Sequence, residues 1–336
     1  MSDNSANNKR IAKNTLFLYF RTILIMLVTL YTSRVVLNTL GVEDFGVYNA
    51  VGGVVSMFAV ISGALSNAIS RYITYGLGKG DKEKLKMIFC TSVNIQIIIA
   101  LIIFVLCEIV GLWFLNSRMN IPEDRLVAAN WVLHCSLLTF VVNLISVPYN
   151  ACIIAHEHMN AYAYISIFDA ILKMSVAYLL IVSPVDKLIA YSVLLFVTAL
   201  GVRLLYGFYC GRHFKECKYK PIYDRVLFKE MMGFAGWNFF GNATSVLNIQ
   251  GVNILINVFF GVVANSARGI ASQIDAAVNQ LVVTFTTAVN PQITKSYAQG
   301  DSQRLNYLVC KGAKFSFFLL LLFAVPLFFE ADTILK

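Results

Sequence analysis

Residues 261–305 read GVVANSARGIASQIDAAVNQLVVTFTTAVNPQITKSYAQGDSQRL. This segment is apolar over most of its length, carries one polar stripe and ends in a Gly-Asp turn. Residues 41–85, which run from GVEDFGVYNA to GKGDKEKL, resemble it at a constant offset of 220 residues. Seven of the 23 aligned pairs between positions 68 and 90 are identical, including Gly80 with Gly300 and Asp81 with Asp301. An internal repeat indicates that the fold is built from two related units.

The composition is that of a multi-pass membrane protein. Apolar residues make up 58% of the chain and charged residues only 13%, whereas soluble domains carry about 25% charged residues. A soluble helical bundle needs a polar face on each helix, but the runs 97–107 and 315–329 have almost none. The net charge of +9 is carried by residues between the apolar segments, so it does not indicate binding to nucleic acid.

Nine segments are long and apolar enough to cross a membrane, for which a helix needs about 20 residues. Because an open chain in lipid satisfies its backbone hydrogen bonds only as a helix, we predict an all-α protein. The segments are 14–37, 45–75, 87–115, 126–155, 160–183, 186–210, 231–260, 267–292 and 309–330.

The distribution of lysine and arginine predicts the orientation. With the N-terminus in the cytoplasm, the cytoplasmic segments hold 17 of these residues and the other side holds six at most. Cytoplasmic loops are enriched in basic residues, so we expect a cytoplasmic N-terminus and place Lys336 on the opposite side. The polar N-terminal segment has no small-residue cleavage site, which argues against a removable signal peptide.

The repeat unit contains six spans, an even number, so both units have the same orientation in the membrane. We therefore predict a six-helix lobe at 1–218 and a partial lobe of three helices at 219–336. The fold class is two parallel six-helix lobes, of which the second is cut off after three helices. We expect the sequence to be a fragment of a longer protein.

Ionisable residues inside spans cost about 2.5–3.5 kcal/mol each on insertion scales and are candidates for function. The basic candidates are Arg21, Arg71, Lys173 and Arg203, with Arg34 and Arg268 near the outer ends of their spans. A polar stripe on 267–292 favours a hydrated cavity, although hydrogen bonding between helices is the alternative. At 100° per residue, the stripe runs along one helix face through Arg268, Ser272, Asp275, Asn279, Thr286 and Asn290. A separate candidate is Asn242, which lies in the amide-rich segment 231–260.

Arg21 and Lys173 differ in whether an acidic residue lies in the same span. Asp169 and Lys173 are four residues apart, so they form either a binding group or a mutually neutralised ion pair. Arg21 has no acidic residue in its own span and is the better candidate for an anion. The planar guanidinium group donates two hydrogen bonds to phosphate oxygens.

The seven cysteines include no CxxC pair and lie mostly in apolar segments, so we predict packing roles, with neither a metal site nor a disulfide framework. His156 and His158 occur in a short cytoplasmic loop and are expected to be solvated. No loop exceeds about 20 residues, and the spans hold no acid, base or metal cluster. We therefore expect a protein that is not an enzyme and has no cofactor.

Residues 40–58 (LGVEDFGVYNAVGGVVSMF) with 71–81 (RYITYGLGKGD), and 264–274 (ANSARGIASQI) with 290–301 (NPQITKSYAQGD), resemble one exporter family. This is the polysaccharide-transporter branch of the multidrug/oligosaccharidyl-lipid/polysaccharide exporter superfamily. More narrowly, the chain is similar to bacterial lipopolysaccharide or O-antigen repeat-unit flippases. The resemblance implies an inner-membrane protein that moves undecaprenyl-pyrophosphate-linked oligosaccharide to the outer leaflet by alternating access.

The resemblance also implies a cationic central cavity, a role that would fall on Arg21, Arg268 and Lys173, with Arg203 and Arg34 as further candidates. Its partners would be the lipid-linked oligosaccharide, membrane lipid, a polysaccharide polymerase and a chain-length regulator. The alternatives are a cation-coupled multidrug-type exporter using Asp169 or Asp275, a membrane glycosyltransferase or polymerase, and an inactive truncated product.

Overall fold

The structure is a computed structural model and describes residues 2–56, 58–119, 121–221 and 224–329. These residues form α-helices and two short 3-10 turns, with no strand among them, which confirms the all-α prediction. Lys336 lies outside the described residues. The elements are α1 Ser2–Ser56, α2 Ala59–Lys79, α3 Lys82–Arg118, η1 Glu123–Arg125, α4 Leu126–Ala155, α5 Met159–Val182, α6 Lys187–His213, η2 Lys215–Cys217, α7 Arg225–Gln299 and α8 Ser302–Phe329.

Six stretches of the described residues are long and apolar enough to cross a membrane. Many of their large apolar side chains point outward, as lipid-facing side chains do, and the protein is a multi-pass membrane protein. The six stretches are Asn8–Val55, Lys82–Ser117, Glu123–Ala155, Met159–Val182, Lys187–His213 and Ser302–Pro326.

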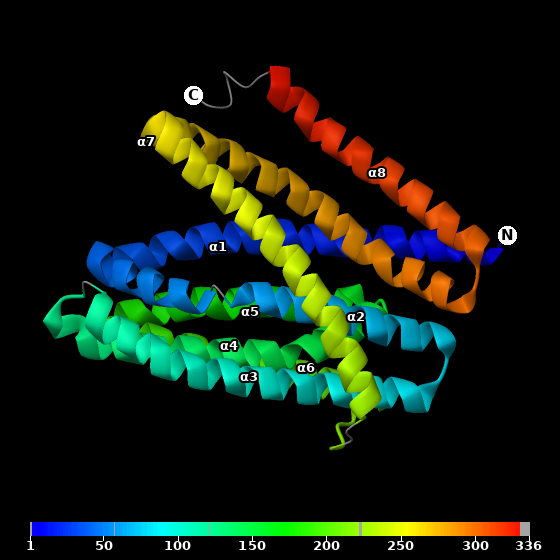
Figure 1. Cartoon of the computed structure of the whole chain (residues 1–336), viewed down its shortest axis with the longest axis horizontal. Coiled ribbons are helices and arrows are strands. Elements are labelled where there is room, and N and C mark those ends of the chain that lie inside the picture. Colours follow the sequence, from blue (N-terminus) through cyan, green and yellow to red (C-terminus); the bar gives the residue numbers. More distant parts are fainter. Residues whose placement is uncertain (1, 57, 120, 222–223, 330–336) are drawn as a thin grey trace.

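Two of the helices fold back on themselves. Inside α1, Gly41 has φ 82° and ψ 169°, a conformation that only glycine adopts readily. The chain reverses there, and the second arm of α1 leads into α2 (Figure 1). The ribbon of α7 likewise runs out and back as two arms (Figure 1). Eight of the nine predicted segments lie almost wholly on a single helix, two of them together on α7, whereas 45–75 combines the second arm of α1 with α2.

The sequence repeat corresponds to a repeated turn. Gly80 has φ 75° and ψ 6°, and Gly300 has φ 77° and ψ 13°, so each closes its helix in the left-handed conformation. Asp81 and Asp301 then cap the next helix by accepting from the amide three residues on, at 3.0 and 2.9 Å. The division into lobes at 218 and 219 stays a prediction.

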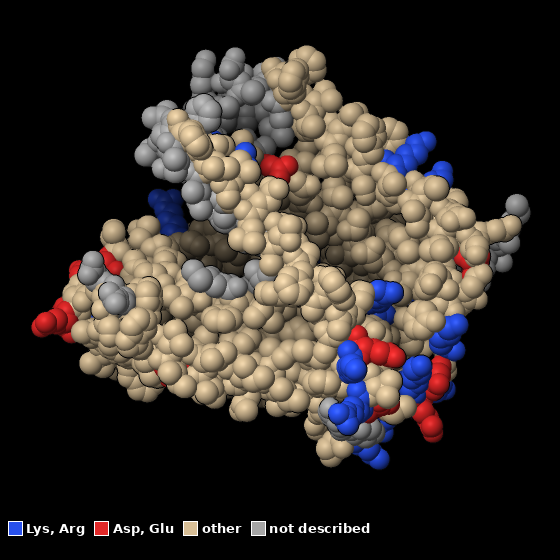
Figure 2. Space-filling view, viewed as in Figure 1, with Lys and Arg blue, Asp and Glu red and all other residues tan. Residues whose placement is uncertain are grey.

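Helices α1 to α6 form one bundle, α7 lies against one side of it, and α8 packs on α7 (Figure 1). The main apolar core is built mostly by α2, α3 and α4, with contributions from α1, α6 and α7, and Phe89 and Leu137 are fully buried in it. We call the end of the bundle that holds the turns Gly80–Asp81, His156–His158 and Gly300–Asp301 the basic end. Lysine and arginine gather there, at the right of Figure 2. The opposite end holds Gly41 and the loops 119–125 and 183–186.

Candidate functional site

A cavity of about 730 Å³ lies within the bundle of α1 to α6. Its lining is mixed, with aliphatic, hydroxyl, amide, aromatic and charged side chains. The polar and charged ones are Arg21, Thr29, Thr32, Ser33, Tyr48, Asn49, Ser62, Thr139, Asn143, Ser146, Asn150, Tyr162, Ser166, Asp169, Lys173, Tyr191 and Tyr206. A polar cavity inside a membrane bundle is a candidate binding site.

Three of the predicted site residues meet at this cavity. Arg21 comes from the middle of the first arm of α1, and Asp169 and Lys173 come from the middle of α5. Lys173 Nζ lies 2.8 Å from Asp169 Oδ2, so these two charges offset each other. This geometry favours the ion-pair interpretation of their spacing.

Arg21 is held differently. Its guanidinium carbon lies 4.6 Å from the centroid of the Tyr162 ring, which supports the side chain from one face. Its Nε is buried and has no hydrogen-bond partner among the described residues. A buried donor without a partner costs about 1–3 kcal/mol. Arg21 therefore has a donor available for an anionic ligand.

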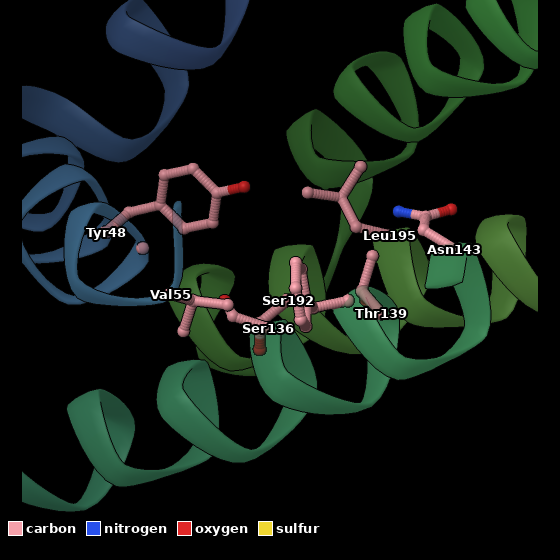
Figure 3. Close-up of a pocket in the computed structure, with 9 residues that line it drawn as sticks. Tyr48, Val55, Ser136, Thr139, Asn143, Ser192 and Leu195 are labelled. Carbon is pink, nitrogen blue, oxygen red and sulfur yellow. The ribbon is translucent and has the colours of Figure 1, made fainter. Parts of the chain in front are cut away.

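A smaller pocket of about 210 Å³ continues the cavity toward the opposite end. In Figure 3, Tyr48 from α1 faces Thr139 and Asn143 from α4 and Leu195 from α6. These four residues line both spaces. Together the two spaces extend along the inner face of α4.

The other predicted cations do not line the cavity. The Arg203 guanidinium carbon lies 3.9 Å from the centroid of the Tyr149 ring, in the packing between α4 and α6. Arg34 is exposed near the opposite end of the first arm of α1. Arg268 is half-buried in α7 and interacts with a neighbour.

The predicted polar stripe lies on the outer surface of α7. Ser272, Asp275 and Asn279 are exposed, and Asn279 Nδ2 donates to Asp275 Oδ1 at 2.9 Å. Thr286 is half-buried and donates to a backbone oxygen of its own helix. Asn242, on the first arm, faces α2, because a Cβ placed on Gly63 would lie 3.8 Å from its Nδ2.

An ion-pair network at the basic end was missed by sequence reasoning. The Glu157 side chain is only 1% exposed, and its two oxygens lie 2.9 Å from Arg10 Nε and 2.8 Å from Lys295 Nζ. Gln292 Nε2 donates to the same carboxylate at 3.1 Å. The network joins α1, the turn after α4, and α7. Gln292 and Lys295 each lie more than 130 residues from Glu157 in the sequence. No local sequence pattern marks these residues as partners.

The histidines beside Glu157 are half-buried and held by protein contacts, so the expectation that they are solvated is wrong. The ring of His156 stacks on Phe214, with centroids 4.1 Å apart, and its Nε2 pairs with Glu216 Oε1. His158 Nδ1 lies 2.9 Å from the hydroxyl oxygen of Tyr209. The two rings are held in place by Tyr209 of α6 and by Phe214 and Glu216 of the linker after α6.

The sequence was next compared with known proteins. A family model described as polysaccharide biosynthesis protein matches residues 11–297. The chain belongs to this family. The uncharacterized membrane protein EpsK of Bacillus subtilis is 21% identical over 289 residues, which are 85% of this chain and 57% of EpsK. The chain thus spans little more than half of that relative.

Solved structures show the same fold for this polysaccharide biosynthesis family member. A MATE crystal structure in the bent conformation has a TM-score of 0.85 at 13% identity and covers 98% of this chain and 74% of that one. A MOP superfamily transporter from Pyrococcus furiosus has a TM-score of 0.81 at 14% identity, covering 98% of this chain and 73% of that one. These likenesses show the fold, which is the one that the resemblance implied.

Proposed function

We propose that this protein moves an undecaprenyl-pyrophosphate-linked oligosaccharide across the cytoplasmic membrane by alternating access, for surface polysaccharide or lipopolysaccharide synthesis. The observation that carries the proposal is Arg21, whose Nε has no protein partner and whose charge is not offset by Asp169 as that of Lys173 is. A pyrophosphate headgroup supplies the oxygens that such a guanidinium binds.

The rest of the cavity suits the sugars that follow the headgroup. Tyr48, Tyr162, Tyr191 and Tyr206 line it together with hydroxyl and amide side chains. Aromatic faces pack against apolar sugar faces, and the amides and hydroxyls of Asn143 and its neighbours both donate and accept hydrogen bonds. The family description, polysaccharide biosynthesis, agrees with such a substrate.

The Glu157 network supports the alternating-access part of this proposal. It joins α1 and the α4–α5 turn to α7 at the basic end, which we place in the cytoplasm with the N-terminus. In an alternating-access cycle these contacts hold one state, and they separate when the cavity opens to the inner leaflet. Closure at this end keeps the headgroup from returning.

The test uses the complete protein in cells that lack their own flippase. A membrane-impermeant glycosidase then measures the lipid-linked oligosaccharide that has reached the outer leaflet. Arg21→Gln is expected to lower this amount about tenfold or more, because a charge-assisted hydrogen bond contributes about 1.5–3 kcal/mol. Arg21→Lys is expected to keep part of the activity, and the exposed Arg212→Gln to keep all of it. Wild-type translocation by Arg21→Gln would contradict the proposal.

A cation-coupled exporter on the same fold is the second candidate, and Asp169 in the cavity is the observation in its favour. A coupling cation has to displace Lys173, whose Nζ lies 2.8 Å from the carboxylate. If this candidate is right, Asp169→Asn changes drug susceptibility in expressing cells and leaves surface polysaccharide unchanged. The opposite pattern supports the flippase.

A further inference from the structure

A cluster of sulfur, imidazole and carboxylate groups lies at the basic end, where the linker after α6 folds back onto α4. Cys152 and His156 are one turn apart at the end of α4. Glu216 and Cys217 belong to η2, the short turn in the linker. The sequence gives only the one-turn spacing of the first pair, because about 60 residues separate it from the second. The sequence predicted only packing roles for the cysteines and did not predict this cluster.

Three of the potential ligand atoms lie close to one another, and a fourth, the Cys217 Sγ, lies next to one of them. Cys152 Sγ, His156 Nε2 and a Glu216 oxygen all lie within 4.8 Å of one another. The Sγ atoms of Cys217 and Cys152 are 3.3 Å apart, and Cys152 Sγ lies 4.0 Å from Glu216 Oε1. Two ligands of a tetrahedral ion with bonds of about 2.0–2.3 Å are themselves about 3.3–3.8 Å apart. The observed separations bracket this range.

Burial and access also suit a bound ion. The two cysteines are buried, at 0% and 5% exposure, whereas the side chains of His156 and Glu216 keep 24% and 11%. The thiols are therefore shielded, while the other two groups leave a route for a metal from the aqueous side. Stacking on Phe214 fixes the plane of the His156 ring.

Other buried cysteines of the chain differ in their surroundings. Cys107 in α3 and Cys135 in α4 are buried free thiols. Within the described ranges, the Cys152, His156 and Glu216 cluster is the one group of three or more such side chains with this ligand geometry. Packing alone explains Cys107 and Cys135, but it does not explain why an imidazole and a carboxylate join two thiols.

We propose that Cys152, His156, Glu216 and Cys217 bind a zinc ion. Thiolate, imidazole and carboxylate together are the donors that zinc prefers, and four protein ligands make a closed, structural site rather than a catalytic one. The ion fastens the linker to the end of α4. It thereby fixes the point from which the chain continues to α7, which begins at Arg225.

The first test is metal content. The purified protein is incubated with zinc, freed of excess ion and measured for zinc per chain, and cobalt replaces zinc in a parallel sample. Wild type is expected to retain equimolar zinc and to show a thiolate-to-cobalt charge-transfer band. Cys152→Ser/Cys217→Ser is expected to lose both, while the matched control Cys107→Ser/Cys135→Ser keeps them. Zinc-free wild type, or full zinc in the first double variant, overturns the proposal.

A second test does not depend on replacing the thiols. Glu216→Gln keeps both cysteines, and trypsin cleavage after Lys218 reports on the linker, since this lysine is exposed. In wild type, zinc is expected to slow this cleavage severalfold relative to a chelator, and in Glu216→Gln the difference is expected to shrink. Equal cleavage of wild type with zinc and with chelator, or a Cys152–Cys217 disulfide in freshly purified protein, overturns the proposal.

Discussion

Gly78 of α2 and Ala298 of α7 meet so closely that a Cβ placed on Gly78 would lie 2.6 Å from the Ala298 Cβ. The same Cβ would also lie 3.2 Å from the backbone of Lys295. The backbone of α2 at Gly78 therefore contacts the side chain of Ala298 in α7, at the basic end and beside the Glu157 network. Both positions belong to the repeated segments, and 298 is the equivalent of 78 at the offset of 220 residues.

Gly78→Ala is expected to push α2 and α7 apart and to destabilise the protein by about 1–3 kcal/mol, the usual cost of overpacking. The gain in helix propensity, about 1 kcal/mol, opposes this cost only in part. Thermal unfolding in detergent measures the change. Gly211→Ala in α6 is the control, because nothing lies within 4 Å of its added Cβ. Equal melting temperatures for the two variants would contradict the expectation.

Glu157→Gln is expected to loosen the basic end, because it leaves the Arg10 and Lys295 charges without their shared carboxylate. The cost is about 1–3 kcal/mol, less than for a fully buried pair because the Arg10 side chain is 52% exposed. A cysteine placed at Ala298, now 4% exposed, reports opening through labelling by a water-soluble maleimide.

Labelling of Ala298→Cys should rise severalfold in the Glu157→Gln background. The exposed Glu83→Gln, also at the basic end, is the matched control and should leave labelling unchanged. If both backgrounds label alike, Glu157 does not hold this end closed.

Arg125→Met is expected to destabilise the opposite end. The Arg125 guanidinium lies 2.7 Å from Asp44 and 2.6 Å from Asp186, so it joins η1 to α1 and to the loop before α6. Without it the Asp44 side chain, 7% exposed, stays buried and unpaired, at a cost of about 1–3 kcal/mol. The melting temperature should fall by several degrees, while the exposed Arg212→Met should leave it unchanged. Arg125→Lys should be intermediate, since one ammonium group replaces a fork that reaches two carboxylates.

Gly41→Ala is expected to cost about 1–3 kcal/mol, because φ 82° with ψ 169° is a region that a side chain disfavours strongly. No atom lies within 4 Å of the added Cβ, so the effect is one of backbone strain and not of crowding. Gly46→Ala, a few residues on in the helical second arm, shares the open surroundings and lacks the strain. Its melting temperature should equal or exceed that of wild type, and a loss as large as that of Gly41→Ala would argue against strain.

The helices were predictable because lipid imposes a simple rule on the sequence: long apolar segments separated by charged turns. The turn at Gly80 and Asp81 could even be paired with Gly300 and Asp301, since the residues that close and cap a helix are few. The continuation of helix across the arms of α7 was not predictable, because composition alone separates spans but does not show how they are joined.

The site was predictable only in part. Arg21, Asp169 and Lys173 line one cavity as their positions inside spans suggested, whereas Arg203 packs on Tyr149 instead. Periodicity fixes which residues share a helix face but not which neighbour that face meets. The partners of Glu157 and Glu216 lie on other elements, far along the chain, so only the folded structure brings them together.

Every residue that lines the main cavity falls between Arg21 and Tyr206. These residues are synthesised before α7, which begins at Arg225. The Glu157 network, by contrast, also takes in Gln292 and Lys295 of α7. A substitution in α7 can therefore change how the basic end is held together while every residue of the cavity wall stays the same.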